Sequence, residues 1–201
     1  MITVNNIPTQ VGKVICVGRN FVKHIEELNN EFPSQMVLFQ KSASAISDTL
    51  IHPMQSCRFE AEICLLIRDK KVYAVGAGLD LTLDVVQNEL KKKGLPWERA
   101  KSFKNSAVFT DFTYVDENSE LQVKLFKNSE PQQDGTEEFM IYPIKEILEQ
   151  CEEVFGLEYN DIIMTGTPEG VDNFTPLDEL NIQLLADGKV ITEQSWTATI
   201  E

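Results

Sequence analysis

Two glutamates separated by a single residue carry the most distinctive chemistry of this sequence. In the stretch RFEAEICLLI, residues 58–67, Glu60 and Glu62 share one parity while apolar residues occupy the other. In a β-strand, such a pair lies on one face about 6–7 Å apart. Two like charges are tolerated there in water, beside cationic side chains or around a metal ion. A solvated face on an edge strand explains the pattern, but Leu66 has the same parity and indicates a partly covered face.

A third acidic side chain bears on this choice. A hard divalent cation such as Mg²⁺ prefers carboxylates and water in an octahedral shell, so a metal site needs a further oxygen donor. Asp80, which ends the stretch VGAGLD, is the candidate. Alternatively, Asp80 caps the N-terminus of the helix expected next, a role that aspartate often fills. The residues alone leave both options open.

The chain has two histidines, so candidates for a catalytic base of this type are few. His24 precedes Glu27 by three residues, a helical spacing that lets a carboxylate orient an imidazole and raise its basicity. An ordinary pair on a helix surface has the same pattern. His52 precedes Pro53 in an expected loop, and we predict no function for it.

Two basic residues are placed where they could hold an anion. Arg19 follows an apolar run, and Lys101 lies in the stretch ERAKSF; the alternative is that both are simply solvated. Gly166 and Gly170 in TGTPEG predict a tight backbone between strands. The pattern GxxxxGK[ST] is missing there, so this is no phosphate loop of that kind.

Composition and charge restrict the partners. Eighteen basic and thirty-two acidic residues give a formal charge of −14, which opposes binding to nucleic acid and to anionic membranes. No apolar run is long enough to span a bilayer, and the first residues lack the pattern of a signal peptide, so we expect a cytoplasmic protein. The four cysteines form no CxxC pair, and we expect neither disulfides nor a zinc site.

Alternating and β-branched runs predict strands at 13–18, 36–41, 58–67, 72–81 and 121–126. Helical periodicity predicts helices at 19–28, 82–93 and 144–156, the last two ended by glycines. Turns are expected at 69–71 and 128–129 and, within a terminal hairpin, at 187–188. Many short strands with few helices and no regular alternation indicate an α+β, β-rich roll or sandwich rather than a doubly wound sheet. Without repeats or linkers, residues 1–201 read as one domain.

Several of these fragments, in this order, resemble the fumarylacetoacetate hydrolase family, and most closely its small single-domain acylpyruvase and oxaloacetate decarboxylase branch. The fragments are VICVGRNFVKHIEELNN, LFQKSASA, FEAE, LDLT, KKKGLPWERAKSF, MI at 140–141 and DIIMTGTPEGV. The resemblance covers nearly the whole chain. It implies a β-roll fold, usually a homodimer, and Mg²⁺ or Mn²⁺ held by Glu60, Glu62 and Asp80.

The same resemblance assigns roles to the other candidates. It implies that His24 and Glu27 act as a dyad, formed when substrate orders their segment as a lid. It also implies that four residues contact the 2-oxo acid or the attacking water: Arg19, Gln87, Lys101 and Thr167.

This chain departs from the family pattern at several places, which affects the expected substrate preference more than the metal site. Arg58 replaces a frequent histidine before the two glutamates. The other departures are Asp84-Val85 for Arg-Asp, Ser42 for proline, Ala107-Val108 for Cys-Pro, Ser129 and Gln132 for Gly and Arg, and Asp172 for glycine.

The reaction implied is hydrolysis of an acylpyruvate. A 2,4-dioxo acid would chelate the ion through its C1 carboxylate and C2 oxygen, with Lys101 and Thr167 fixing the carboxylate. Glu27 would orient His24, which activates water to attack C4, and cleavage of the C3–C4 bond leaves pyruvate enolate. Decarboxylation or tautomerisation of oxaloacetate is an alternative in the same site. A relative that binds a metal and a dicarboxylate without catalysis is the second alternative.

Overall fold

The computed structural model describes residues 1–27 and 33–201. Its strands are β1 (Ile2–Val4), β2 (Ile7–Thr9), β3 (Val14–Gly18), β4 (Val37–Lys41), β5 (Arg58–Phe59), β6 (Ala61–Arg68), β7 (Lys71–Asp80), β8 (Ala107–Phe109), β9 (Leu121–Lys127), β10 (Glu130–Thr136), β11 (Asp161–Met164), β12 (Asp172–Asn173), β13 (Glu179–Ala186) and β14 (Lys189–Thr197). Its helices are α1 (Val22–Glu27), α2 (Asp84–Lys93), α3 (Glu98–Lys101) and α4 (Ile144–Phe155), with short 3₁₀ turns at Ala43–Ala45 and Glu137–Phe139.

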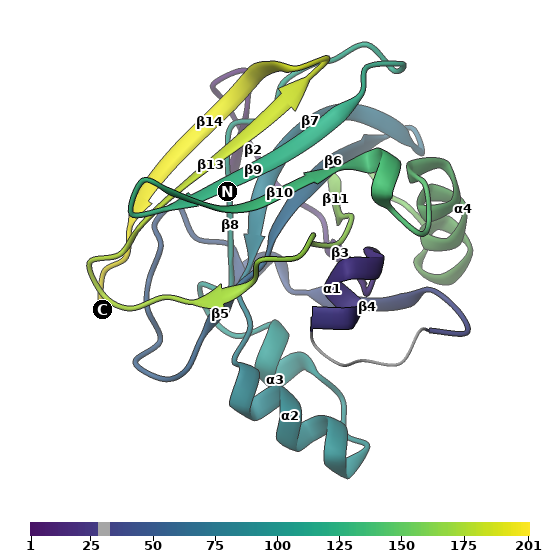
Figure 1. The fold of residues 1–201 in the computed structure, drawn as a ribbon. Helices are drawn as coiled ribbons and strands as arrows, with labels where there is room; N and C mark the ends of the chain where they lie inside the picture. The colour runs from purple at the N-terminus through teal and green to yellow at the C-terminus, as the bar shows by residue number, and fades with distance from the viewer. Residues whose placement is uncertain (28–32) are drawn as a thin grey trace.

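Two sheets form the body of the protein (Figure 1). The larger has the order β4-β3-β11-β6-β7-β8 and is antiparallel except where β11 runs parallel to β3. The smaller has the order β10-β9-β13-β14. The strand pairs β1-β2 and β5-β12 complete the pairing of the described strands. The β-rich fold class predicted from the sequence is confirmed.

The two faces of β6 serve different purposes. Its odd-numbered residues, such as Ile63 and Leu65, belong to the main core that the larger sheet shares with β9 and β13. On the other face, Cys64 and Leu66 belong to a smaller apolar cluster. Since side chains alternate along a strand, Glu62 lies on this second face, next to the smaller cluster.

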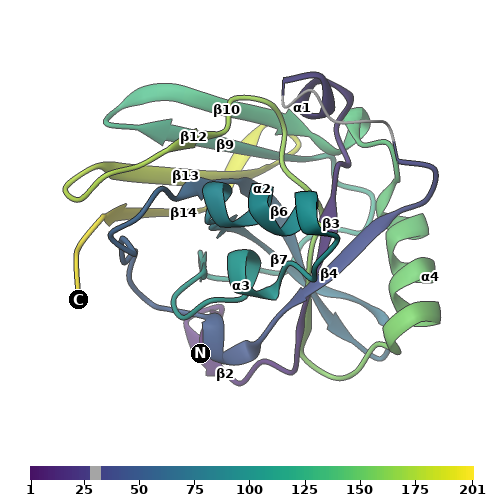
Figure 2. The same ribbon diagram turned by 90° about the horizontal axis from the view of Figure 1, so that it is seen from below.

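The helices lie at the margins of the sheets. Figures 1 and 2 show α2 and α3 side by side at one end of the molecule, with α4 on another side. The Leu83 N–H donates to the Ala100 carbonyl at 3.0 Å, which ties the start of α2 to α3. In α4 the apolar stripe buries Ile147 and Cys151 against the main core.

Most predicted elements are present with shifted ends. The expected strand 58–67 is interrupted at Glu60, and the expected helix 82–93 begins at Asp84. The expected helix 19–28 begins only at Val22, and its residue 28 lies outside the described residues. The terminal hairpin turns at Asp187 and Gly188 with φ of 50° and 75°, as a two-residue turn of this kind requires.

Two alternatives considered for the acidic residues are wrong. The two glutamates do not lie on a solvated edge strand, because β6 is an inner strand between β11 and β7 and both side chains are buried. Asp80 does not cap a helix, because it ends β7 and α2 begins four residues later.

Two further features follow from the sequence patterns. All four cysteines are buried free thiols. Among the residues described, no helix has the length and apolarity that crossing a membrane requires.

Candidate metal centre and active site

Three carboxylates converge at the open end of the β6–β7 hairpin. Two contacts bring the ends of these strands together. Ala61 pairs with Leu79, and the Asp80 N–H donates to the Glu60 carbonyl at 2.8 Å. Glu60, Glu62 and Asp80 each offer an oxygen within 4.8 Å of the others, and they are 6%, 2% and 1% exposed. The structure thus brings together the three residues that the sequence singled out as metal ligands.

Three cationic side chains surround this cluster. Lys101 Nζ lies 2.8 Å from both Glu60 Oε2 and Asp80 Oδ2, and it is almost completely buried. Lys41 Nζ lies 2.8 Å from Asp80 Oδ1. Arg58, one of the departures from the family pattern, donates Nε and Nη2 to Glu60 Oε1 at 3.0 and 2.9 Å. Lys101 is therefore a buried partner of the carboxylates, and the solvated alternative is wrong for it.

Lys41 is a residue that the sequence reasoning missed. It ends β4 and is fully buried, where its ammonium also donates to the carbonyls of Leu81, Lys101 and Ser106. A lysine inside the apolar run MVLFQK was a usable signal, because a lysine is almost never fully buried without a partner. Its four contacts connect β4 to the loops that carry the site.

The surroundings shift the pKa values of the two glutamates in opposite directions. Burial raises the pKa of Glu60, but the positive charges of Lys101 and Arg58 outweigh it and hold this pKa well below its usual range. Burial, followed by the negative charges of Asp80 and Glu60, raises the pKa of Glu62 well above its ordinary value. The Gly166 N–H that donates to Glu62 Oε2 at 2.7 Å opposes this only in part.

The donor set fits a hard divalent cation. Neighbouring ligands of an octahedral Mg²⁺ ion, each at about 2.1 Å from it, lie about 3 Å apart, so the three oxygens, which lie within 4.8 Å of one another, would move closer together around a bound ion. Asp80 Oδ1 lies 2.8 Å from Lys41 Nζ but is buried without a hydrogen bond among the described residues, and so it keeps a lone pair for a ligand. The residues could therefore hold Mg²⁺ or Mn²⁺.

Metal binding should release a proton from Glu62. The raised pKa means that this carboxyl keeps its proton to higher pH in the free protein, and a metal must displace that proton. We expect affinity for Mn²⁺ to rise with pH and binding to be accompanied by proton release, because this carboxyl must be ionised to bind the ion. Titration calorimetry in two buffers with different ionisation enthalpies, between about pH 6 and 8, measures this. Heats that do not depend on the buffer would contradict it.

The two residues expected to form a dyad both lie on α1. His24 is 5% exposed, and its Nδ1 lies 3.5 Å from Glu27 Oε2, longer than a usual hydrogen bond. The Gly170 N–H donates to both Glu27 oxygens, at 3.0 and 3.3 Å. Burial lowers the pKa of His24, while the charges of Glu60 and Glu27 partly oppose it, so the imidazole is neutral at neutral pH. The pair is thus not an ordinary one on a helix surface.

The loop after β11 closes the site from the other side. Gly166 has φ of +104°, and a Cβ there would lie 2.7 Å from the Asn20 Cβ, which explains the glycine. The Thr167 hydroxyl donates to the Ala61 carbonyl at 2.8 Å and accepts from Gln133 Nε2 at 2.8 Å. Gln133, on β10, also accepts from the Ala61 N–H. It is a buried supporting residue that nothing in its local sequence indicated.

The other two expected substrate contacts lie on α2 and directly after β3. Gln87 is 4% exposed in the second turn of α2. Arg19 follows β3 with φ of +58°, and its charge acts on Lys91 of α2. The charge effect on Lys91 connects Arg19 to α2, whereas the burial of Gln87 does not by itself place its side chain beside the carboxylates.

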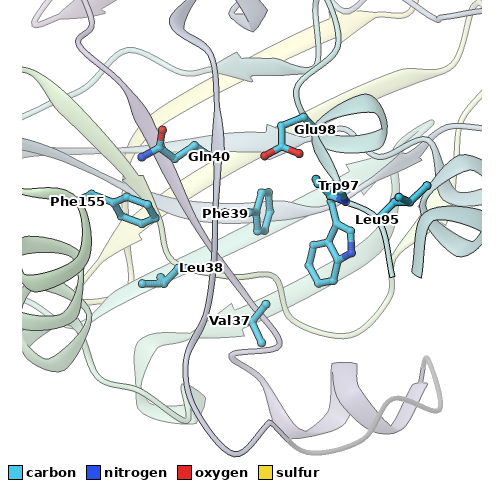
Figure 3. Close-up of a pocket in the computed structure, with 9 residues that line it drawn as sticks. Val37, Leu38, Phe39, Gln40, Leu95, Trp97, Glu98 and Phe155 are labelled. Atoms are coloured by element: carbon cyan, nitrogen blue, oxygen red, sulfur yellow. The ribbon is translucent and has the colours of Figure 1, made fainter. Parts of the chain in front are cut away.

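An apolar groove on the outer side of β4 is separate from the candidate site (Figure 3). Phe39, Trp97 and Phe155 are among its lining residues, and none of the candidate site residues line it. The Phe39 ring contacts Trp97 edge to face and has its centroid 5.1 Å from Lys101 Nζ. Phe39 thus lies between the groove and the buried ammonium.

A β-rich fold with three buried, converging carboxylates that could hold a divalent cation defines the class of protein. Residues 13–195 match the family described as Fumarylacetoacetate (FAA) hydrolase C-terminal, and the chain belongs to this family.

Known relatives extend this assignment. The chain is 35% identical to oxaloacetate tautomerase YcgM of Escherichia coli, over 90% of this chain and 91% of that protein. A fumarylacetoacetate isomerase/hydrolase homologue from Oleispira antarctica has a similar structure, with TM-score 0.93, 35% identity and coverage of 98% and 99%. Fumarylpyruvate hydrolase from Pseudomonas aeruginosa, solved with Mn²⁺ and pyruvate, has TM-score 0.87 over 100% and 95% of the chains. Its 24% identity supports the fold alone.

Proposed function

We propose that this protein is a metal-dependent enzyme that interconverts the enol and keto forms of oxaloacetate. The observation that carries the proposal is the buried His24, with Glu27 next to it on α1, in a chain that has three converging carboxylates and is 35% identical to an oxaloacetate tautomerase. This favours the alternative considered from the sequence over its main interpretation, acylpyruvate hydrolysis.

The charge of the site supports a dianionic substrate. Three carboxylates face three cations, Lys41, Lys101 and Arg58, so these charges cancel when all are ionised. With a divalent ion bound, two positive charges would be left over in a buried region. A dicarboxylate such as oxaloacetate neutralises this excess, whereas a monocarboxylate leaves part of it uncompensated.

In the proposed reaction His24 transfers the proton. The neutral imidazole takes a proton from C3 of the keto form, and Glu27 stabilises the resulting imidazolium. The imidazolium then returns the proton to the C2 oxygen, so that the C2=O double bond becomes C2=C3. Lys101, Arg19 and Gln87 orient the substrate. A divalent ion held by Glu60, Glu62 and Asp80 would supply Lewis acidity that stabilises negative charge developing at C2.

The test follows the ultraviolet absorbance of the enol after oxaloacetate is added. With Mg²⁺ or Mn²⁺ present, we expect the enol to approach equilibrium much faster than in buffer, and EDTA to remove about 99% of this acceleration or more. The matched control is the metal ion without protein, because metal ions alone act on 2-oxo acids. Acceleration that persists after complete removal of metal would overturn the proposal.

Acylpyruvate hydrolysis is the second candidate. It is favoured by the same dyad, since an imidazole oriented by a carboxylate can also take a proton from water. Pyruvate release from acetylpyruvate, measured on the same preparation with kcat/KM for both substrates, distinguishes the two. We expect the ratio to favour oxaloacetate.

A further inference from the structure

One lysine of the run at the end of α2 differs from its neighbours. Lys91 follows Gln87 by four residues, so the two side chains lie on the same face of the helix. Gln87 is buried and Lys91 is half-buried, whereas Lys92 and Lys93 are exposed. Lys91 is therefore less exposed to water than the two lysines that follow it.

The surroundings of Lys91 are cationic. Its Nζ lies 5.3 Å from the centroid of the Trp97 ring, which covers one side of the ammonium. Burial, and then the positive charges of Arg19, Lys101 and Arg58, lowers the pKa of Lys91 to about 8. Within residues 1–27 and 33–201, no carboxylate lies within ion-pair distance of Lys91.

This arrangement is unfavourable without an anion. Arg58 and Lys101 have carboxylate partners in the metal centre, but Lys91 is partly desolvated and has only the face of a ring and the more distant charge of Glu60 for compensation. A carboxylate placed beside Lys91 would relieve both the desolvation and the repulsion, through a charge-assisted hydrogen bond. The geometry thus fits an anionic group at a distance from the metal-binding carboxylates.

We propose that Lys91 binds the second carboxylate of a four-carbon 2-oxo or 2-hydroxy dicarboxylate, whose C1 carboxylate and C2 oxygen face the metal centre. The inference rests on the proposed function in placing the substrate in this site. It makes Lys91 the residue that selects a dicarboxylate over the corresponding monocarboxylate.

Two inert ligands separate this role from catalysis. Malate and lactate share the C1 carboxylate and the C2 hydroxyl, and malate alone has a second carboxylate. Titration calorimetry of the Mn²⁺-loaded protein should show tighter binding of malate. In Lys91→Met, which keeps an apolar stem over Trp97, we expect malate affinity to fall about tenfold or more and lactate affinity to change less than about twofold.

Two control variants and the relative losses for malate and lactate decide whether Lys91 binds the second carboxylate. Lys92→Met, on the exposed side of the same turn, should behave like the unmodified protein, and Lys91→Arg should keep most of the preference for malate. An equal loss for malate and lactate in Lys91→Met, or no loss for either, overturns the inference and leaves Lys91 as a support for Trp97. If Lys91 selects malate in a protein that does not act on oxaloacetate, the proposed function fails while this inference stands.

Discussion

Replacing Glu62 by glutamine is expected to reduce Mn²⁺ affinity at least about 100-fold and tautomerase activity at least about 1,000-fold. The amide oxygen can still accept the Gly166 N–H that reaches Glu62 Oε2 at 2.7 Å, so the loop after β11 keeps its position. What is lost is the negative charge that a divalent cation needs. Calorimetry with Mn²⁺ and the enol assay measure the two effects on one preparation.

The same substitution should not destabilise the metal-free protein. Since the folded state raises the pKa of Glu62 above its ordinary value of 4.5, ionising this group costs folding free energy as the pH rises through and beyond that value. Glutamine removes this cost. Without metal, we expect the Tm of Glu62→Gln to equal or exceed that of the unmodified protein, with a difference that grows with pH.

A matched control is Glu117→Gln, at an exposed turn, which should change neither metal affinity nor Tm. A Glu62→Gln variant that still binds Mn²⁺ with unchanged affinity would show that the three carboxylates do not form the metal centre. A strongly lowered Tm of metal-free Glu62→Gln would show that the folded protein stabilises the charged form of Glu62, contrary to the raised pKa.

The elements that could be predicted from the sequence are those with local signals. Helix α4 has a continuous apolar stripe and ends at Gly156, and the last hairpin has an Asp-Gly turn, so both follow from neighbouring residues. The break at Glu60 was not predictable from alternation alone. It arises because Arg58 and Phe59 pair with β12 while the residues after Glu60 pair with β7 and β11.

The candidate site likewise contains residues that local sequence patterns indicate and residues that depend on contacts between distant strands. Residue spacing brought Glu60, Glu62 and Asp80 into consideration, and the family resemblance was needed to favour a metal site over a solvated face. Lys41 and Gln133 were missed because their roles depend on contacts across the fold: Lys41 reaches Asp80 from β4, and Gln133 reaches Thr167 from β10. Such pairings form only when distant strands meet, and single-sequence periodicity carries no information about them.

His24→Asn is expected to lower kcat/KM for oxaloacetate tautomerisation by about 100-fold to 10,000-fold, with Mn²⁺ affinity nearly unchanged. Asparagine cannot exchange a proton near neutral pH. In the unmodified protein the neutral imidazole is the active form, because burial lowers the pKa of His24 below 6.5. Activity should therefore be constant at neutral pH and fall as the pH drops through this lowered pKa, and the fall should be absent in His24→Asn.

Glu27→Gln provides the complementary test, because it keeps an oxygen for the Gly170 N–H while removing the charge. The Glu27 carboxylate raises the pKa of His24, so its loss should move the acid limb of the pH profile to lower pH while reducing kcat. A purely structural role of Glu27 would lower activity at all pH values without moving the limb. A limb that is unchanged in both variants would show that another group transfers the proton, because removing the titrating base abolishes its limb.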